Sequence, residues 1–286
     1  MGIFRVMKQT TPHFLNPGDT IGISATARFA RPEMIETAKS VLEASGFKVY
    51  YEPGILSQHH QLAGTVEERV AQFNALVHHP EVKAIWNVRG GYGSAEIVDA
   101  VDWAALQKNP KWLVGFSDFT TFLCHGVQQG MATLHAPMPI SFETTKKEAI
   151  EATLKVLMGE EDALHCALPK EVHGQVIAGN LSVIYSILGT PSLPSLNGCI
   201  LLLEDLDEYH YHLDRMLLAL RRRGAFNGLQ AVVLGVFTDI HDHHIPWGPD
   251  VRHSLRKHFE AAGVPVYENP IIGHGKENWP ILLRSV

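Results

Sequence analysis

The chain has 286 residues, of which 45% are hydrophobic and 19% are charged, so its composition excludes a disordered or collagen-like protein. A chain of this length is longer than one hydrophobic core usually stabilises, so we predict two domains. The formal net charge of -6 leaves no basic surplus for a phosphate backbone or an anionic membrane surface, which argues against nucleic-acid and membrane partners.

Strands and helices alternate through the first half of the chain. The apolar segment 20–24 reads as a buried strand, and Pro32 then opens a helix with its apolar residues on one face. Thr65 and Glu68 have the spacing of a capping box at the next helix. Further strands are predicted at 47–51, 84–88, 112–116 and 132–134, and further helices from Ser94 and Asp118. This alternation predicts a parallel sheet with helices on both faces.

The second half resumes the alternation on a smaller scale. A helix at 146–157 and an irregular stretch up to His173 come first. Strands then follow at 175–178, 199–203 and 231–237, and helices from Leu181, at 211–222 and at 251–262. We therefore predict an α/β protein with an N-terminal parallel-sheet domain at 1–145, a linker at 146–174 and a smaller C-terminal α/β domain at 175–286.

The cysteines and the apolar runs indicate the compartment. Cys124, Cys166 and Cys199 have no CxxC spacing, which argues against a disulfide framework or a zinc ribbon and favours a reducing compartment. No run approaches the roughly 18 apolar residues that a membrane helix needs, and the first residues lack the apolar core of a signal peptide. We expect a cytoplasmic protein.

The segment 112–120 places a serine directly after an apolar strand. Gly115, Phe116 and Ser117 lead into a predicted helix start, which is the shape of a nucleophile elbow. Such a turn exposes the serine Oγ and lets N–H groups of the helix start stabilise a developing oxyanion. The pattern GxSxG is not met, because Phe119 replaces the second glycine. A plain helix N-cap at Ser117 or Asp118 is the alternative.

A glycine-rich segment follows another predicted strand. Arg89-Gly90-Gly91-Tyr92-Gly93 matches neither a phosphate-binding Walker loop nor the dinucleotide fingerprint, yet its glycines indicate close access to the backbone. Because ligands of open α/β sheets bind at the carboxyl ends of the strands, we expect this loop and Ser117 at the same edge.

A base and a carboxylate that orients it are needed to activate a serine. Glu204 and Asp205 come directly after the apolar residues 201–203. His274 lies between Gly273 and Gly275, which give its ring room and backbone freedom. These residues are the candidates for that pair.

Five short motifs together resemble the LD-carboxypeptidase family, a family of serine peptidases, and they follow the family's order across nearly the whole chain. They are Arg89-Gly90-Gly91-Tyr92-Gly93, Gly115-Phe116-Ser117-Asp118, Gly179-Asn180-Leu181-Ser182, Leu203-Glu204-Asp205 and Gly273-His274-Gly275.

The resemblance implies a catalytic triad that is divided between the two domains. Ser117 would be the nucleophile on the first domain, and Glu204 and His274 would complete the triad from the second. The implied reaction releases terminal D-alanine from a murein tetrapeptide through an acyl-enzyme, without a metal or other cofactor. A homodimer is in keeping with the family.

The resemblance also assigns residues around the triad. The backbone N–H groups of Asp118 and Gly91 are expected to form the oxyanion hole, and Arg89, Tyr92 and Asn180 to contact the substrate.

The loop after the first strand departs from the family pattern. Residues 25–31 contain arginines where a turn rich in serine, proline and glycine is expected. Arg28 or Arg31 reaching a substrate carboxylate is one interpretation, and a solvated loop arginine is the other.

Two other groups of residues are rival candidates for a site. His241, His243 and His244 carry ligand types that suit zinc, but neighbouring strand residues point to opposite faces. Cys124 and His125 are adjacent within an apolar helix, where neighbours do not face each other, so a cysteine nucleophile is disfavoured.

Two alternative functions also remain. Relatives in the same family cleave aminoacyl-nucleotide antibiotics and confer self-immunity, although the added aromatic loop of those proteins is not found in this sequence. A small-molecule binding protein with its cleft between two domains is the alternative from another class.

Overall fold

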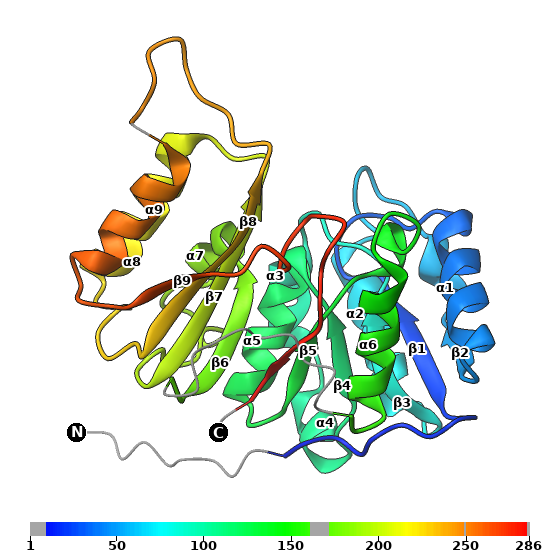
Figure 1. The fold of residues 1–286 in the computed structure, drawn as a ribbon. Helices are drawn as coiled ribbons and strands as arrows, with labels where there is room; N and C mark the ends of the chain where they lie inside the picture. The colour runs from blue at the N-terminus through cyan, green and yellow to red at the C-terminus, as the bar shows by residue number, and fades with distance from the viewer. Residues whose placement is uncertain (1–9, 161–171, 249, 285–286) are drawn as a thin grey trace.

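The computed structural model describes residues 10–160, 172–248 and 250–284, which form two sheets side by side (Figure 1). The first sheet has six strands in the order β10-β5-β4-β3-β1-β2. All its neighbouring strands pair in parallel except β10, which runs antiparallel to β5. Its strands are β1 (Thr20–Ser24), β2 (Lys48–Tyr51), β3 (Val82–Asn87), β4 (Trp112–Gly115), β5 (Thr133–His135) and β10 (Ile281–Leu283).

Helices cover both faces of the first sheet, and the side chains of β3 show why. Trp86 belongs to one buried cluster, together with α1 and α6 residues, whereas Val82 and Ile85 belong to another, together with α2 and α5 residues. A parallel strand that is buried on both faces has apolar residues at nearly every position. The helices are α1 (Pro32–Ala44), α2 (Val66–His78), α3 (Ser94–Ile97), α4 (Trp103–Lys108), α5 (Thr120–Gln128) and α6 (Lys147–Leu157), with short 3-10 turns at Pro53–Leu56, Val98–Ala100, Ser117–Phe119 and Pro139–Ser141.

The second sheet is smaller and entirely parallel, with strand order β6-β7-β8-β9. Its buried residues share one continuous cluster with those of α2 and α5, so the two sheets are packed together. The elements are β6 (Gln175–Asn180), α7 (Leu181–Ser186), β7 (Cys199–Leu206), α8 (His210–Arg222), β8 (Ala231–Thr238), α9 (Val251–Glu260) and β9 (Val266–Glu268).

Two close approaches join the sheets. The N–H of Val176 on β6 donates to the carbonyl oxygen of Arg284, just after β10, at 3.2 Å. A Cβ atom at Gly179 would lie 2.2 Å from Cγ2 of Thr120, so only glycine lets the end of β6 lie against the start of α5. The second contact brings the carboxyl end of β6 beside the turn that carries Ser117.

The predicted α/β class with a larger and a smaller parallel layer is confirmed. Several details differ from the prediction. The helix from Ser94 ends after one turn, at Ile97, and the strands β9 and β10 were not predicted. The helix predicted at 146–157 is present as α6 and packs on the first sheet, and residues 161–171 of the expected linker lie outside the described residues. The domain boundaries 1–145, 146–174 and 175–286 stay a prediction. Among the described residues, no helix is both long and apolar enough to cross a membrane.

Candidate active site

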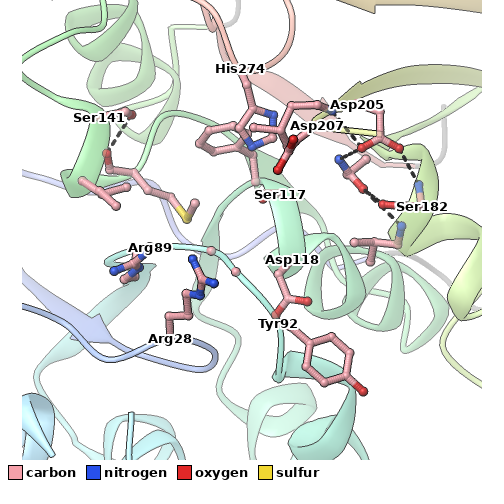
Figure 2. Close-up of a pocket in the computed structure, with 18 of the residues that line it drawn as sticks. Arg28, Arg89, Tyr92, Ser117, Asp118, Ser141, Ser182, Asp205, Asp207 and His274 are labelled. Carbon is pink, nitrogen blue, oxygen red and sulfur yellow. Dashed lines mark hydrogen bonds between the residues drawn. The ribbon is translucent and has the colours of Figure 1, made fainter. Parts of the chain in front are cut away.

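A cleft of about 830 Å³ opens at the carboxyl ends of strands from both sheets (Figure 2). The first sheet supplies loops after β1, β3 and β4, and the second supplies loops after β6 and β7. Most of the predicted site residues line this cleft, namely Ser117, His274, Asp118, Gly91, Arg89, Tyr92 and Asn180. Glu204 is fully buried behind them.

Ser117 has a strained backbone. Its φ of +59° lies in the left-handed region, which non-glycine residues rarely adopt and which marks functional turns. One residue, Phe116, separates it from the end of β4, and it begins a 3-10 turn that continues into α5, as in a nucleophile elbow. A Cβ atom at Gly90 would lie 2.8 Å from Ser117 Oγ, so the glycine-rich loop passes close to that oxygen.

His274 and Glu204 form a buried pair. His274 Nδ1 lies 2.6 Å from Glu204 Oε2, and the Glu204 side chain has no exposed surface. Burial lowers the pKa of His274, but the charge of Glu204 and its hydrogen bond outweigh that effect and hold the pKa above its ordinary value of 6.5. The Phe116 ring lies 4.7 Å from the imidazole, centre to centre, and limits the movement of His274.

Glu204 and Asp205 are consecutive residues of β7, so their side chains point to opposite faces of the sheet. The pairing with β8 shifts register beside them, because Leu203 pairs with Leu234 and Asp205 with Phe237, which leaves an extra residue on β8. Glu204 meets His274, while Asp205 accepts hydrogen bonds from Asn180 Nδ2 at 2.7 Å and from Ser182 N at 2.9 Å. Asp205 therefore anchors the start of α7.

Asp205 is nearly fully buried. Burial first, and then the charge of Glu204, raise its pKa to about 7 against the opposing effect of three hydrogen bonds. Asn180 lines the cleft, but its side chain is engaged with Asp205, Ser182 and the Val183 N–H as the N-cap of α7.

Asp118 connects the serine turn to the glycine-rich loop. Its buried carboxylate accepts a hydrogen bond from Ser94 N at 2.9 Å, and burial raises its pKa. The Asp118 N atom lies 3.4 Å from the place that a Cβ of Gly90 would occupy. That backbone N–H, next to Ser117, is thus close to the loop that contains Gly91.

The remaining predicted contacts lie along the rim. Tyr92 is 68% exposed. Arg89 is half-buried and donates to the Phe29 carbonyl oxygen at 3.3 Å. Arg28 also lines the cleft, whereas Arg31 is not among its lining residues.

Two buried residues behind the site were missed by the sequence analysis. His135 Nε2 lies 3.1 Å from Asn278 Oδ1, and the same oxygen accepts from Gly273 N at 3.4 Å. His135 is on β5 of the first sheet, so this pair ties the loop of His274 to that sheet. The only signal in the sequence was their place beside predicted site elements.

The rival sites have other contacts. His241 Nε2 lies 2.7 Å from Asp207 Oδ1, and His243 stacks on Tyr209 at 5.0 Å. Within the described ranges, no group of three or more His, Cys, Asp or Glu residues is arranged to hold a metal ion. Cys124 is fully buried, which raises its pKa to about 12 and disfavours a reactive thiolate.

Comparisons with known proteins identify the family. The model of the LD-carboxypeptidase N-terminal domain matches residues 21–136, and that of the LD-carboxypeptidase C-terminal domain matches residues 173–285. The chain is 32% identical to "Probable murein peptide carboxypeptidase" of Bacillus subtilis, over 92% of this chain and 86% of the relative. It is 30% identical to the murein tetrapeptide carboxypeptidase of Pseudomonas aeruginosa, over 91% and 90%.

Solved structures agree with these relatives. The crystal structure of muramoyltetrapeptide carboxypeptidase from Oxalobacter formigenes has a TM-score of 0.80 and 27% identity, with 92% of each chain covered. The microcin C7 self-immunity protein of Escherichia coli is a more distant relative, 26% identical over 80% of each chain.

The fold and these relatives define a serine carboxypeptidase. The chain belongs to the LD-carboxypeptidase family, as its five motifs predicted. The roles predicted for individual residues stay predictions and enter the proposal below.

Proposed function

We propose that this carboxypeptidase acts on murein peptides and releases the terminal D-alanine of the tetrapeptide, with Ser117 as nucleophile, His274 as general base and Glu204 as the group that orients the base. The observation that supports this most is that His274 lines the cleft that holds Ser117, while its Nδ1 is fixed by a buried carboxylate.

The reaction proceeds in two steps, acylation of the serine and hydrolysis of the acyl-enzyme. Ser117 Oγ attacks the carbonyl carbon of the scissile amide and passes its proton to Nε2 of His274, the ring nitrogen not held by Glu204. The C–N bond then breaks, the proton moves to the leaving amine, and D-alanine departs. Water attacks the acyl-enzyme in the second step, again with His274 as base, and frees the tripeptide and Ser117.

The negative charge that develops on the carbonyl oxygen needs donors. The N–H groups of Asp118 and Gly91 are our candidates for this oxyanion hole. The closeness of the Gly90 backbone to both Ser117 Oγ and Asp118 N supports this assignment. Such fixed donors contribute on the order of 10²–10³ in rate.

The self-immunity reading is the second candidate, because the chain is also related to the microcin C7 self-immunity protein. The two murein carboxypeptidase relatives are more similar to this chain and match more of it. A binding protein without turnover is disfavoured, since ligand binding alone gives no reason for a strained serine beside an oriented histidine.

The cellular setting is part of the same proposal. We place the enzyme in the cytoplasm, acting on recovered cell-wall peptides as a homodimer. The free thiols of Cys124 and Cys199, both buried, fit a reducing compartment.

The test is a turnover assay on three peptides. The enzyme is expected to release D-alanine from a tetrapeptide that ends in an L-centre followed by D-alanine. It should not cleave an all-L analogue, because inverting the terminal centre misplaces the carboxylate, and misplacement by about 1 Å costs roughly a hundredfold. It should also not cleave a pentapeptide ending in D-Ala-D-Ala, because there the residue that supplies the scissile carbonyl has the D instead of the L configuration. Chiral separation and mass identify the product. Equal release from the L-terminal and D-terminal peptides would refute the proposal, and cleavage of aminoacyl-nucleotides alone would favour the second candidate.

A further inference from the structure

Two arginines face the cleft from the loops after β1 and β3. Arg28 follows β1, and Arg89 follows β3. The strand order 2-1-3-4-5 reverses between β1 and β3, and ligands of open α/β sheets bind at such a reversal, outside the carboxyl ends of the strands. The two side chains therefore flank the place where the fold favours a ligand.

Neither arginine has an acidic partner within the part of the chain that the structure describes. Arg28 Nε and Nη2 both donate to one neutral acceptor, Gln61 Oε1, at 3.1 and 2.6 Å. Arg89 donates one bond to a backbone carbonyl, and its buried Nε has no partner among the described residues. Two guanidinium groups that line one cleft and are not paired with a carboxylate leave donors for an incoming anion.

The charges around Arg89 also favour a bound anion. Burial first, and then the positive charges of Arg28 and Arg31, lower the pKa of Arg89. A bound anion would relieve this repulsion, and a carboxylate suits a guanidinium because it can accept two parallel hydrogen bonds.

The cleft has opposite charges on its two sides. Figure 2 shows Arg28 and Arg89 on one side of Ser117, and Asp207 on the other. An anionic end of a substrate is attracted to the arginine side and repelled from the aspartate side. This polarity fixes the direction in which a peptide crosses Ser117.

Arg28 is also close to the candidate oxyanion hole. A Cβ atom at Gly91 would lie 2.6 Å from Arg28 Cγ, so the arginine stem lies across the Gly91 backbone. In a peptide, the terminal carboxylate carbon is three bonds from the scissile carbonyl carbon, which is within about 4 Å. A guanidinium anchored over Gly91 is thus within reach of the carboxylate of the leaving residue.

We propose that Arg28, assisted by Arg89, binds the free α-carboxylate of the terminal residue and so limits the enzyme to the last peptide bond. This inference rests on the proposed function and names the group that makes the site exopeptidic.

The test compares a tetrapeptide carrying a free terminal carboxylate with its C-terminal amide and with a form amidated only at a side-chain carboxylate. Wild-type enzyme is expected to prefer the free terminal acid over the terminal amide by about a hundredfold in kcat/KM, and to accept the side-chain amide. R28Q should lose most of this preference by cleaving the free acid about 10- to 100-fold more slowly while leaving the terminal amide nearly unchanged. R28K should restore part of it, because it keeps the charge but not the fork of donors.

R31Q is the matched control, since Arg31 is an exposed arginine of the same loop outside the lining of the cleft. It should keep the preference. If R28Q slows the acid and the terminal amide equally, Arg28 does not read the carboxylate. If R28Q abolishes only a preference for the side-chain acid, the anchor serves another carboxylate. Either result overturns the proposal.

A binding measurement tests this inference independently of the proposed function. In S117A, titration calorimetry should show that the free-acid peptide binds more tightly than the terminal amide, and adding R28Q should remove that difference. This outcome supports the anchor even if the turnover assay fails. Equal affinities for acid and amide in S117A would overturn it even if turnover is found.

Discussion

Glu204 Oε2 lies 2.6 Å from Nδ1 of His274, although 70 residues separate the two in the sequence. Glu204 comes from the end of β7, and His274 from a loop that continues into β10 of the first sheet. A Cβ atom at Gly273 would lie 3.0 Å from Glu204 Cβ, so glycine permits this approach. This hydrogen bond fixes the orientation of the imidazole and leaves Nε2 as the ring nitrogen that can accept a proton.

The pH dependence of turnover tests this pair. His274 must be neutral to accept a proton, and its pKa is raised, so kcat/KM should fall on the acidic side with a midpoint above 6.5. Glu204→Gln removes the charge that raises this pKa. The variant should fold, lose much of its rate and show an acidic midpoint at lower pH than the wild type.

The measurement is a series of kcat/KM values from about pH 5 to 9 for both proteins. A wild-type profile that is flat over this range would contradict histidine base catalysis. An unmoved midpoint in Glu204→Gln would show that another group titrates.

Replacing Ser117 tests the nucleophile. Ser117→Ala should lower kcat by at least about 10³-fold, because the Oγ that forms the acyl-enzyme is gone, and alanine needs no new space. Released D-alanine and the melting temperature are measured together. Ser186→Ala is the control, since Ser186 is an exposed serine whose Oγ donates to the Val183 carbonyl oxygen. Parent-like turnover in Ser117→Ala would disprove the assignment.

Asn278 supports the loop of His274 from behind. Asn278→Ala leaves His135 Nε2 and Gly273 N without their shared acceptor, and such a buried loss costs about 1–3 kcal/mol of unfolding free energy. We expect lower kcat with little change in KM, because the loop carries His274, the proposed base, and not the residues proposed to contact the substrate. Denaturant titration and steady-state kinetics are the measurements. Asn227→Ala, at an exposed asparagine, should change neither, and an unaffected Asn278→Ala would show that the loop is held by other contacts.

Local signals in the sequence identified most of the fold. The capping box of Thr65 and Glu68 is confirmed, with Glu68 Oε2 accepting from Thr65 N at 2.7 Å. The strands of both parallel layers are apolar at nearly every position, and their order of appearance predicted the α/β class. The strand β10 was missed because its three residues pair antiparallel with β5, 146 to 150 residues earlier, and no local pattern records such a partner.

In the candidate site, too, some features follow from consecutive residues and others depend on contacts between distant segments. Only Phe116 separates Ser117 from its strand, so the turn could be read from consecutive residues. The role of Asn180 in holding Asp205 could not be read, because it depends on the pairing of β6 with β7. The partners of Arg28 were also hidden, since Gln61 and Gly91 reach it from two other loops.

Asp205 gives the last prediction, which concerns stability. Its pKa is about 7 in the folded protein, against an ordinary aspartate pKa of 3.8, which represents the unfolded chain. Between these values the folded state binds a proton that the unfolded state has released. Asp205 therefore contributes most stability below about pH 4, and this contribution is lost as pH rises through about 7, by at most about 1.4 kcal/mol per pH unit.

Asp205→Asn does not titrate, so its unfolding free energy should improve relative to the parent as the pH rises from 4.5 to 8. The amide can still accept from Asn180 Nδ2, although it meets the Ser182 N–H less favourably, so the variant is expected to be less stable at acidic pH and to recover at alkaline pH. Urea midpoints at several pH values give the difference, in which groups common to both proteins cancel. Asp239→Asn, at an exposed aspartate, is the control and should run parallel to the parent. If the Asp205→Asn curve is also parallel to the parent, the buried carboxylate has the same pKa in both states, and its hydrogen bonds must offset burial and the charge of Glu204 in full.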